Sequence, residues 1–370
     1  MKLRPFALER FFARYEFGTR YLLCASDAQS LEIDDLLALE PDARKKLGEV
    51  WLGYTESRGG PDLRRTIARL YEHGDPESIL VHAGSEEPIF AFMQSVVEPT
   101  DRVAVQFPCY QSHYAVAESL GARVDRWHSD LAAGGAPDLA ALEGLAGPQT
   151  RAIVLTTPNN PTGYAFDRAQ IDGVVAIARR YGCYVLCDEV YRGSERESAA
   201  IPPICDLYER GVSLGGLSKA FGLAGVRIGW ISTRDRELYN RMAAIKDYLT
   251  ICNSAPSEFL AALALRHAPA LLERVRAIAA ANLDCLDEFF ARRRSLFDWR
   301  RPQAGTTAFP RYLAGSSEAF CERLVERAGV LLLPSTVFDA GDERVRFGYG
   351  RANLPEAVAA LDAFVEEEFR

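Results

Sequence analysis

The chain has 370 residues, 48% of them hydrophobic and 25% charged, a composition typical of a soluble globular protein. A chain of this length is longer than a domain with a single hydrophobic core usually is, so we expect a large and a smaller domain. The net charge of −8 argues against a nucleic-acid partner, because such partners favour a basic surface. The sequence shows neither an apolar run long enough for a membrane span nor the apolar region of a secretory signal, so we expect a cytoplasmic protein without a membrane partner.

Cysteines and histidines indicate neither disulfides nor a metal. Eight cysteines are scattered along the chain without C-x-x-C spacing, which predicts free, buried thiols in a reducing compartment. The five histidines show no metal-ligand spacing, so we expect no metal site.

The N-terminal segment, residues 1–45, is rich in aromatic and charged side chains. It predicts an arm that packs on the rest of the chain, with a short helix at 31–39. Glu9 and Asp27 are candidate substrate-binding carboxylates in this arm. The alternative is that each is a solvated charge beside buried aromatic residues.

Two helix starts follow the arm. The break at Gly59-Gly60-Pro61 ends a loop that carries Tyr54 and predicts a helix at 62–72, because proline suits the first helical turn. A short strand at 79–82 leads into a second helix, which runs to residue 96. Backbone N–H groups at such a start attract anions, so this turn is a candidate phosphate site. Its residues are Gly84, Ser85 and Glu86.

The next two strands end at residues suited to hold a planar ring. The strand at 101–106 is followed by Tyr110, whose aromatic face suits an electron-poor ring, and by a helix at 112–120. The apolar strand at 151–157 ends in Pro-Asn-Asn-Pro-Thr-Gly, a rigid turn that presents Asn160.

A further helix and strand, at 168–181 and 184–187, lead directly to Asp188. A carboxylate at the end of a buried strand is costly unless it is paired. A protonated ring nitrogen would be a suitable partner, and Tyr191 lies close by in the sequence.

One lysine lies among small residues. After a strand at 212–217, Ser218 and Lys219 precede a glycine-rich run that contains Arg227 and continues as a strand at 226–232. A lysine in a dry, crowded pocket has a lowered pKa and can form a Schiff base with an aldehyde. A nearby arginine suits a phosphate, so the two indicate pyridoxal phosphate (PLP). The alternative is that both are surface charges beside a turn.

The C-terminal part predicts helices at 236–246 and 256–293 and strands at 330–333 and 345–350. Arg346, in the last strand, is a candidate for bidentate binding of a carboxylate, which needs arginine rather than lysine.

Repeated βα units with ligand-type residues at the strand ends predict an α/β protein built on an open, mostly parallel sheet. We expect a large domain over residues 46–270. The smaller domain would combine residues 1–45 with 271–370.

In their order along the chain, these motifs resemble those of the class I and II aminotransferases, a family of fold-type I PLP-dependent enzymes. The most specific matches are the Asn-Pro-Thr-Gly turn and the lysine segment, where the family has Ser-x-Ser-Lys followed by Gly-x-Arg-x-Gly. One departure is Gly216, which stands where the family has its first serine, a phosphate ligand. The resemblance implies a mostly parallel seven-stranded sheet flanked by helices, and a smaller α+β domain.

The resemblance also implies a role for each matched residue. Lys219 would carry the cofactor and act as the catalytic base, and Asp188 would hold the ring nitrogen. Asn160 and Tyr191 would contact the phenolic oxygen, and Tyr110 would stack on the ring. The implied phosphate ligands are Gly84, Ser85, Glu86, Ser218, Arg227 and Tyr54.

Two further roles concern the substrate and the assembly. Arg346, with Arg344 and Arg351 as rivals, would bind the substrate α-carboxylate, and Asn160 would lie beside it. In the family, the residue that Tyr54 matches reaches the cofactor of a neighbouring subunit, which implies a homodimer with shared active sites.

The leading interpretation is an aminotransferase of amino-acid metabolism that acts on an L-amino acid through an internal aldimine, an external aldimine and a quinonoid. The alternative is a PLP-dependent lyase, cyclase or oxidase that acts on an arginine-like amino acid, with β- or γ-elimination and ring closure. The chain resembles, more loosely, the branch with capreomycidine- and enduracididine-forming cyclases, and Glu9 or Asp27 could hold a guanidinium. A PLP-sensing regulator, the third interpretation, would need a helix-turn-helix domain ahead of the match.

Overall fold

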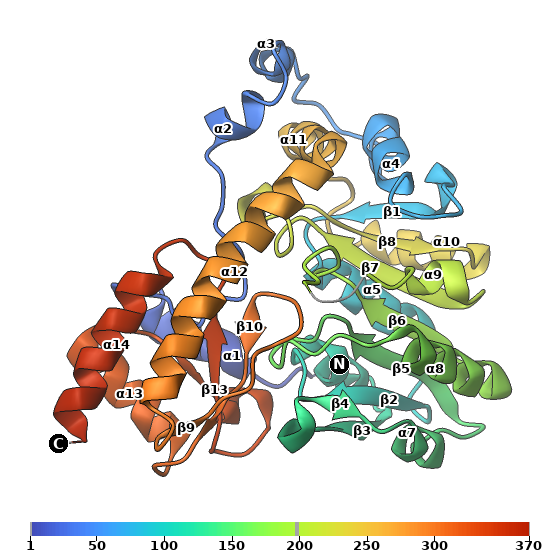
Figure 1. The fold of residues 1–370 in the computed structure, drawn as a ribbon. Coiled ribbons are helices and arrows are strands. Elements are labelled where there is room, and N and C mark those ends of the chain that lie inside the picture. The colour runs from blue at the N-terminus through green and yellow to red at the C-terminus, as the bar shows by residue number, and fades with distance from the viewer. Residues whose placement is uncertain (1, 197–199, 370) are drawn as a thin grey trace.

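The structure is a computed structural model that describes residues 2–196 and 200–369. Its centre is one sheet with the strand order β1-β8-β7-β6-β5-β2-β3-β4 (Figure 1). Strands β3, β2, β5, β6 and β7 are parallel neighbours, while β8 runs antiparallel between β7 and β1. The strands are β1 (Ile79–His82), β2 (Arg102–Phe107), β3 (Arg123–Asp130), β4 (Ala136–Pro137), β5 (Thr150–Thr156), β6 (Tyr184–Asp188), β7 (Gly211–Gly216) and β8 (Gly229–Thr233).

The predicted α/β fold with a mostly parallel sheet is confirmed. Seven strands form the sheet as expected, and the two-residue β4 adds an eighth by pairing with the end of β3. Almost every residue is buried in five of the strands, as expected for a sheet covered on both faces; these are β1, β2, β5, β6 and β7.

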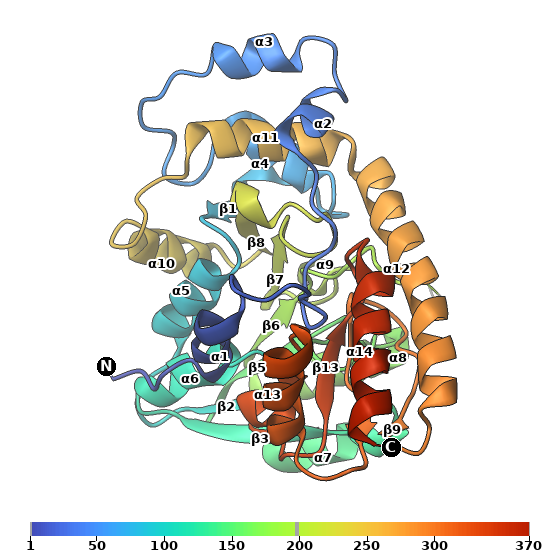
Figure 2. The same cartoon turned by 90° about the vertical axis from the view of Figure 1, so that its left-hand side faces the viewer.

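Helices cover both faces of the sheet (Figures 1 and 2). In β5, Ala152 and Val154 pack in one cluster with α5, α6 and α10, whereas Ile153 and Leu155 pack in another with α7, α8 and α9. These helices are α5 (Glu86–Val96), α6 (Ser112–Ser119), α7 (Leu139–Leu145), α8 (Arg168–Tyr181), α9 (Ile204–Leu207) and α10 (Arg236–Lys246).

A third cluster joins the β1 edge of the sheet to helices near the top of Figure 1. These helices are α2 (Ile33–Leu37), α4 (Pro61–Ala68), α11 (Ala255–Arg266) and the first turns of α12 (Ala268–Arg292), with α3 (Ala43–Gly48) beside them. Helix α12 runs from this cluster down to the remaining elements (Figure 2).

The remaining elements form a fourth cluster of buried residues, to which both ends of the chain contribute. It contains α1 (Ala7–Tyr15), the end of α12, α13 (Ser317–Ala328), α14 (Leu354–Glu368) and short strands. The strands are β9 (Phe297–Asp298), β10 (Thr307–Ala308), β11 (Arg311–Tyr312), β12 (Leu333–Pro334) and β13 (Val345–Gly348).

Four predicted elements were wrong in their bounds. The helix expected at 62–72 ends at Ala68. The strand expected at 226–232 begins only at Gly229, because Arg227 adopts a left-handed conformation with φ of 54°. The helix expected at 256–293 is two helices that meet at His267, where a proline opens the second. Of the strand expected at 330–333, only Leu333 pairs with β13.

The arm contains a regular helix, α1, which the sequence analysis did not identify. Helices α3, α7, α13 and α14 and strand β3 were also not identified. Strand β3 lies next to the sheet edge, and most of its side chains are polar and at least partly exposed, so it lacks the apolar run that marks its neighbours.

Candidate active site

The predicted functional residues gather at the carboxyl ends of the parallel strands. They line a cavity of about 220 Å³, which also receives residues from α1 and β13. Ligands bind at this edge in open α/β sheets. The predicted residues among its lining are Glu9, Ser85, Glu86, Tyr110, Asn160, Asp188, Tyr191, Ser218, Lys219, Arg227 and Arg346.

Three predicted residues lie outside this lining. Gly84 lies behind it, where a Cβ would collide with the Arg227 guanidinium. Tyr54 is 84% exposed on the surface of the single chain. Asp27, expected at the substrate, is instead held by both carboxylate oxygens to Arg351, at 2.9 Å each, which commits its charge to that arginine.

Lys219 lies in the loop after β7, and its Nζ donates a hydrogen bond to Ser26 Oγ at 2.8 Å. Burial lowers the pKa of Lys219 to about 8; the carboxylates of Asp27 and Asp188 oppose this effect and the guanidinium of Arg346 adds to it. The amine is therefore partly neutral near pH 7 and can act as a nucleophile or a base.

Asp188 ends β6 with a buried carboxylate that faces the cavity. Its Oδ2 lies 3.2 Å from Nε2 of His113, a buried residue of α6. The Nδ1 of His113 lies 3.5 Å from Thr156 Oγ1. Sequence analysis assigned His113 no functional role, because only the fold brings α6 against the end of β6.

Tyr110 and two carboxylates form one wall of the cavity. The Tyr110 hydroxyl lies 3.5 Å from Glu9 Oε1, and the Ser112 hydroxyl donates to Glu86 at 3.1 Å. Burial raises the pKa of Glu86 to about 6. The Glu86 side chain is thus engaged away from any phosphate, and its backbone N–H, free at the start of α5, is the group that suits an anion.

Arg346 is a fully buried guanidinium that faces the same cavity. It donates to the Cys24 carbonyl at 3.1 and 2.9 Å and to Asn160 Oδ1 at 3.1 Å. Among residues 2–196 and 200–369, no carboxylate lies within ion-pair distance of it. Its two rivals are elsewhere, because Arg351 binds Asp27 and Arg344 lines a different cavity.

The corner of the cavity beside Arg227 is tightly packed. A Cβ at Gly229 would lie 2.6 Å from the carbonyl carbon of Gly84, so the two segments need glycine at their crossing. A Cβ at Gly216 would collide with Ser85 Oγ, which donates to the Gly215 carbonyl at 3.3 Å. The Ser85 hydroxyl therefore occupies the space that a side chain at position 216 would need.

This packing predicts how Gly216 and Ser85 depend on each other. We expect Gly216→Ser alone to cost about 1–3 kcal/mol in stability through overpacking and to weaken PLP binding. The double variant Ser85→Gly, Gly216→Ser moves the hydroxyl from one segment to the other, so it should regain most of both losses. Thermal unfolding and PLP titration of the two variants and of Ser85→Gly check this. A stable, tightly binding single Gly216→Ser variant would contradict the expected collision.

Comparison with known proteins agrees with this geometry. The family model for class I and II aminotransferases matches residues 22–361. Capreomycidine synthase of Streptomyces vinaceus is 29% identical over 358 residues, which cover 96% of this chain and 92% of that protein. A PLP-dependent aminotransferase from Streptococcus suis superposes with a TM-score of 0.94 at 33% identity, with 100% of both chains covered. The PLP-dependent cyclase OrfR superposes with a TM-score of 0.92 at 27% identity, covering 100% of this chain and 98% of that chain.

The chain belongs to the class I and II aminotransferase family, and it is a PLP-dependent enzyme. The residues of the cavity fit this cofactor. A buried carboxylate, an amine of lowered pKa and an arginine beside a glycine-lined corner suit the ring nitrogen, the aldehyde and the phosphate, respectively.

Proposed function

We propose that this enzyme transfers the amino group of an L-amino acid to a keto acid, with PLP as the carrier. The observation that carries the proposal is that the Lys219 amine and the Arg346 guanidinium, which has no carboxylate partner among the described residues, open onto one cavity. The first suits a base at the substrate α-carbon, and the second suits the substrate carboxylate.

The cofactor supplies an electron sink for the pair of electrons left when the α-proton departs. Asp188 would hold its ring nitrogen, and Tyr110 would pack on its ring. Asn160 and Tyr191 would hold its phenolic oxygen. The phosphate would lie against Ser85, Ser218, Arg227 and the start of α5.

The chain's own groups then position the substrate and move the proton. Arg346 binds the α-carboxylate and orients the α-hydrogen toward Lys219. Lys219 Nζ would take the α-proton and keep it within the cavity for return. Ser26, at 2.8 Å, holds that nitrogen in place.

A second candidate function is elimination or ring closure on an arginine-like amino acid. Two of the similar proteins carry such names, a capreomycidine synthase and a PLP-dependent cyclase. The cavity also contains the carboxylates of Glu9 and Glu86, which suit a guanidinium. Asp27 is a weaker candidate because Arg351 already binds it.

A single-turnover experiment separates the two functions. The PLP-loaded enzyme is mixed with a panel of amino acids, including arginine and its hydroxylated forms, and no keto acid is added. Transamination converts the cofactor to its pyridoxamine form and releases a keto acid. Release of water, ammonia or a cyclised product, with the cofactor left as the aldehyde, would assign elimination or cyclisation instead.

Replacement of Arg346 by lysine should raise KM about tenfold or more for any amino-acid substrate, because lysine keeps the charge and loses the bidentate contact. Steady-state kinetics measure the effect. The control is Arg351→Lys, whose native partner is Asp27, and it should change KM by less than about threefold. A raised KM in the control and an unchanged KM in Arg346→Lys would move the carboxylate site to Arg351.

We also propose a homodimer with shared active sites. Two exposed segments lie side by side, since Thr55 Oγ1 donates to the Asn253 carbonyl at 3.1 Å and Ser57 Oγ to Asp247 at 2.9 Å. Their large apolar side chains are mostly exposed in the single chain, which is typical of a surface that a partner covers. They are Trp51, Leu52, Tyr54, Tyr248, Leu249 and Ile251.

A charge placed in this surface should separate the subunits. We expect Leu52→Asp to be monomeric by sedimentation and to bind PLP more weakly than wild type, because Tyr54 of a neighbouring subunit would no longer reach the phosphate. Leu3→Asp, a change at another exposed apolar residue, is the control and should stay dimeric. A wild-type protein that sediments as a monomer with full activity would refute the shared site.

No helix in the described part of the chain is long and apolar enough to cross a membrane. We place the enzyme in the cytoplasm, where its eight free cysteines would remain reduced. The division into a large domain at 46–270 and a small domain at 1–45 and 271–370 stays a proposal. The separate cluster formed by the two chain ends supports it.

A further inference from the structure

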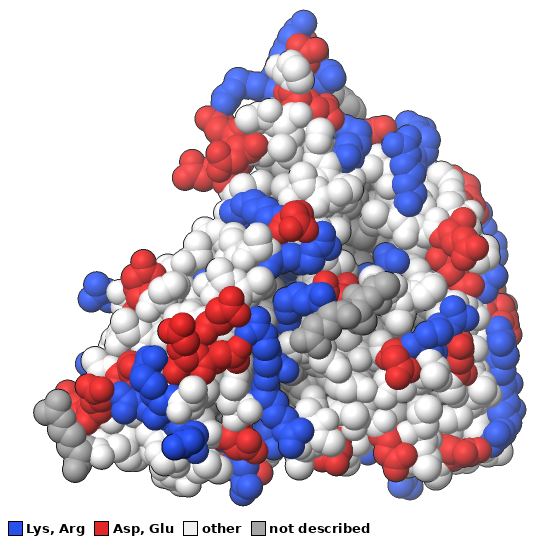
Figure 3. Space-filling model, viewed as in Figure 1, with Lys and Arg blue, Asp and Glu red and all other residues white. Residues whose placement is uncertain are grey.

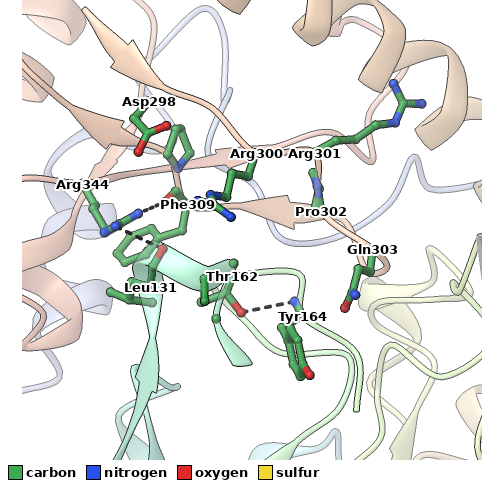
Figure 4. Close-up of a pocket in the computed structure, with 14 residues that line it drawn as sticks. Leu131, Thr162, Tyr164, Asp298, Arg300, Arg301, Pro302, Gln303, Phe309 and Arg344 are labelled. Atoms are coloured by element: carbon green, nitrogen blue, oxygen red, sulfur yellow. Dashed lines mark hydrogen bonds between the residues drawn. The ribbon is translucent and has the colours of Figure 1, made fainter. Parts of the chain in front are cut away.

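A second cavity, of about 410 Å³, lies apart from the active site and shares no lining residue with it. It is enclosed between the loop that joins β3 to β4, the turn after β5, and the segments around β9, β10 and β11 (Figure 4). On the face shown in Figure 3, Lys and Arg side chains gather along the middle of the molecule, where these segments meet the sheet.

Three arginines line this cavity, and one of them is already neutralised. Arg301 forms ion pairs with Asp284, at 3.0 Å, and with Asp287. Arg300 has no hydrogen bond or ion pair among the residues that the structure describes, and Arg344 has no carboxylate within ion-pair distance among them. Neither of the two forms an ion pair with a described residue, although the carboxylates of Glu343 and Asp298 lie close enough to act on Arg344.

Arg344 is the unusual member, because it is only 9% exposed. It donates to the carbonyls of Phe309, at 2.9 Å, and Leu131, at 3.3 Å, which fix the guanidinium at the cavity wall. These contacts use two of its five N–H donors. A buried charge without a counter-ion is costly, and a bound anion would offset that cost.

The hydroxyls on the opposite wall are engaged within the protein, because Thr162 donates to Asn159 Oδ1 at 2.8 Å and Tyr164 is hydrogen-bonded to Gln170. Figure 4 shows Arg300 and Arg344 on one side of the cavity, with Thr162 and Tyr164 on the other. Gln303, also in the lining, accepts from the Ala165 N–H through its oxygen, which leaves its amide N–H₂ able to donate. Among the described residues of the lining, Asp298 is the single carboxylate.

We propose that this cavity is a second binding site, which takes a small dianion, either an organic dicarboxylate or a phosphate. Arg344 and Arg300 each bind one side of the dianion. Thr162 lies two residues beyond Asn160, and Arg344 two residues before Arg346. A dianion bound to Arg344 would thus lie against the strand whose Arg346 donates to Asn160 Oδ1, at 3.1 Å, in the active site.

The test is calorimetric titration of the full-length PLP-loaded enzyme with malonate and, separately, with inorganic phosphate, at low ionic strength. We expect one of the two to bind and to raise the Tm, and the anion that binds identifies the class of ligand. Arg300→Gln should weaken binding by about tenfold or more, since it removes a charge-assisted contact. Arg344→Lys should weaken binding to a similar extent, because lysine lacks the planar guanidinium and its fixed N–H donors.

The matched control is Arg301→Gln, which removes a charge from the same cavity that Asp284 and Asp287 already balance, and it should change binding by less than about threefold. Failure of both anions to bind wild type would overturn the proposal. So would unchanged binding in Arg300→Gln, or binding that is lost in Arg346→Lys alone, which would place the anion in the active site. If Arg344→Lys does not fold, Arg300→Gln decides.

Discussion

Replacement of Lys219 by alanine should leave a folded protein that neither holds PLP covalently nor turns over substrate. We expect kcat to fall by about 10⁴-fold or more, because one side chain supplies both the covalent anchor and the base. Borohydride reduction followed by mass spectrometry measures the anchor directly. The wild-type peptide that contains Lys219 should gain the mass of the reduced cofactor, and the variant should gain none. Normal turnover in the variant would refute the central assignment.

The same lysine gives a pH dependence whose sign follows from its environment. Burial lowers the pKa of Lys219 from 10.5 to about 8 in the folded protein. Covalent capture of PLP by the apoprotein should therefore speed up as pH rises through about 8, where half of the amine is neutral, and level off about one pH unit higher. Stopped-flow absorbance measures the rate.

Stability should respond in the same pH window. Between about pH 8 and 10.5 the folded apoprotein binds fewer protons at Lys219 than the unfolded chain does, so its stability relative to Lys219→Ala should rise with pH through that interval. Below pH 8 the wild-type apoprotein carries the cost of a buried protonated amine. The variant should then unfold at no lower temperature than wild type.

Much of this site could be predicted from sequence because the carboxyl ends of parallel strands lie at the same edge of a sheet. Once Asp188 and Lys219 are placed directly after apolar strands, their convergence follows from the sheet alone. The bounds predicted for helix α8 agree with the structure. Its amphipathic run marks the helix, and a capping box of Asp167 and Gln170 opens it.

The parts that sequence could not supply depend on contacts between distant segments. Asp27 was a reasonable substrate ligand until the fold placed Arg351 against it, 324 positions away. The position of Arg346 in the sequence favoured it over Arg344, and the structure adds that the two arginines line different cavities. In the sequence, Gly216 indicates that a phosphate-binding hydroxyl is missing. The structure shows that the Ser85 hydroxyl occupies the space a side chain at position 216 would need.

His113 is another residue that sequence analysis missed, and it lies beside Asp188. Its imidazole lies 3.2 Å from the carboxylate that would hold the cofactor nitrogen, and it lines the cavity itself. We propose that this imidazole positions Asp188. Its replacement by glutamine should therefore have much less effect in an Asp188→Asn background than in wild type, because two residues that act as a unit are not additive.

Replacement of Asp188 by asparagine has the second largest expected effect. Asparagine keeps the shape of the side chain, and its oxygen can still accept from the Val190 N–H, which now lies 3.2 Å from Asp188 Oδ1. It loses the negative charge that would hold a protonated ring nitrogen, so the electron sink weakens at the step that removes the α-proton. We expect kcat to fall by about 10²–10³-fold, as for the loss of other fixed charges at reacting centres.

The neighbouring carboxylate gives a matched control for this prediction. Glu189 is buried beside Asp188, but it accepts from the Ile204 N–H and the Ser213 hydroxyl and does not line the cavity. Burial raises its pKa to about 7, so Glu189→Gln removes only about half a charge at pH 7 and should leave kcat within a few-fold of wild type. Both variants should still be labelled at Lys219 by borohydride. A loss of kcat that is equal in the two would show general damage to the strand end, and it would remove Asp188 from its proposed role at the ring nitrogen.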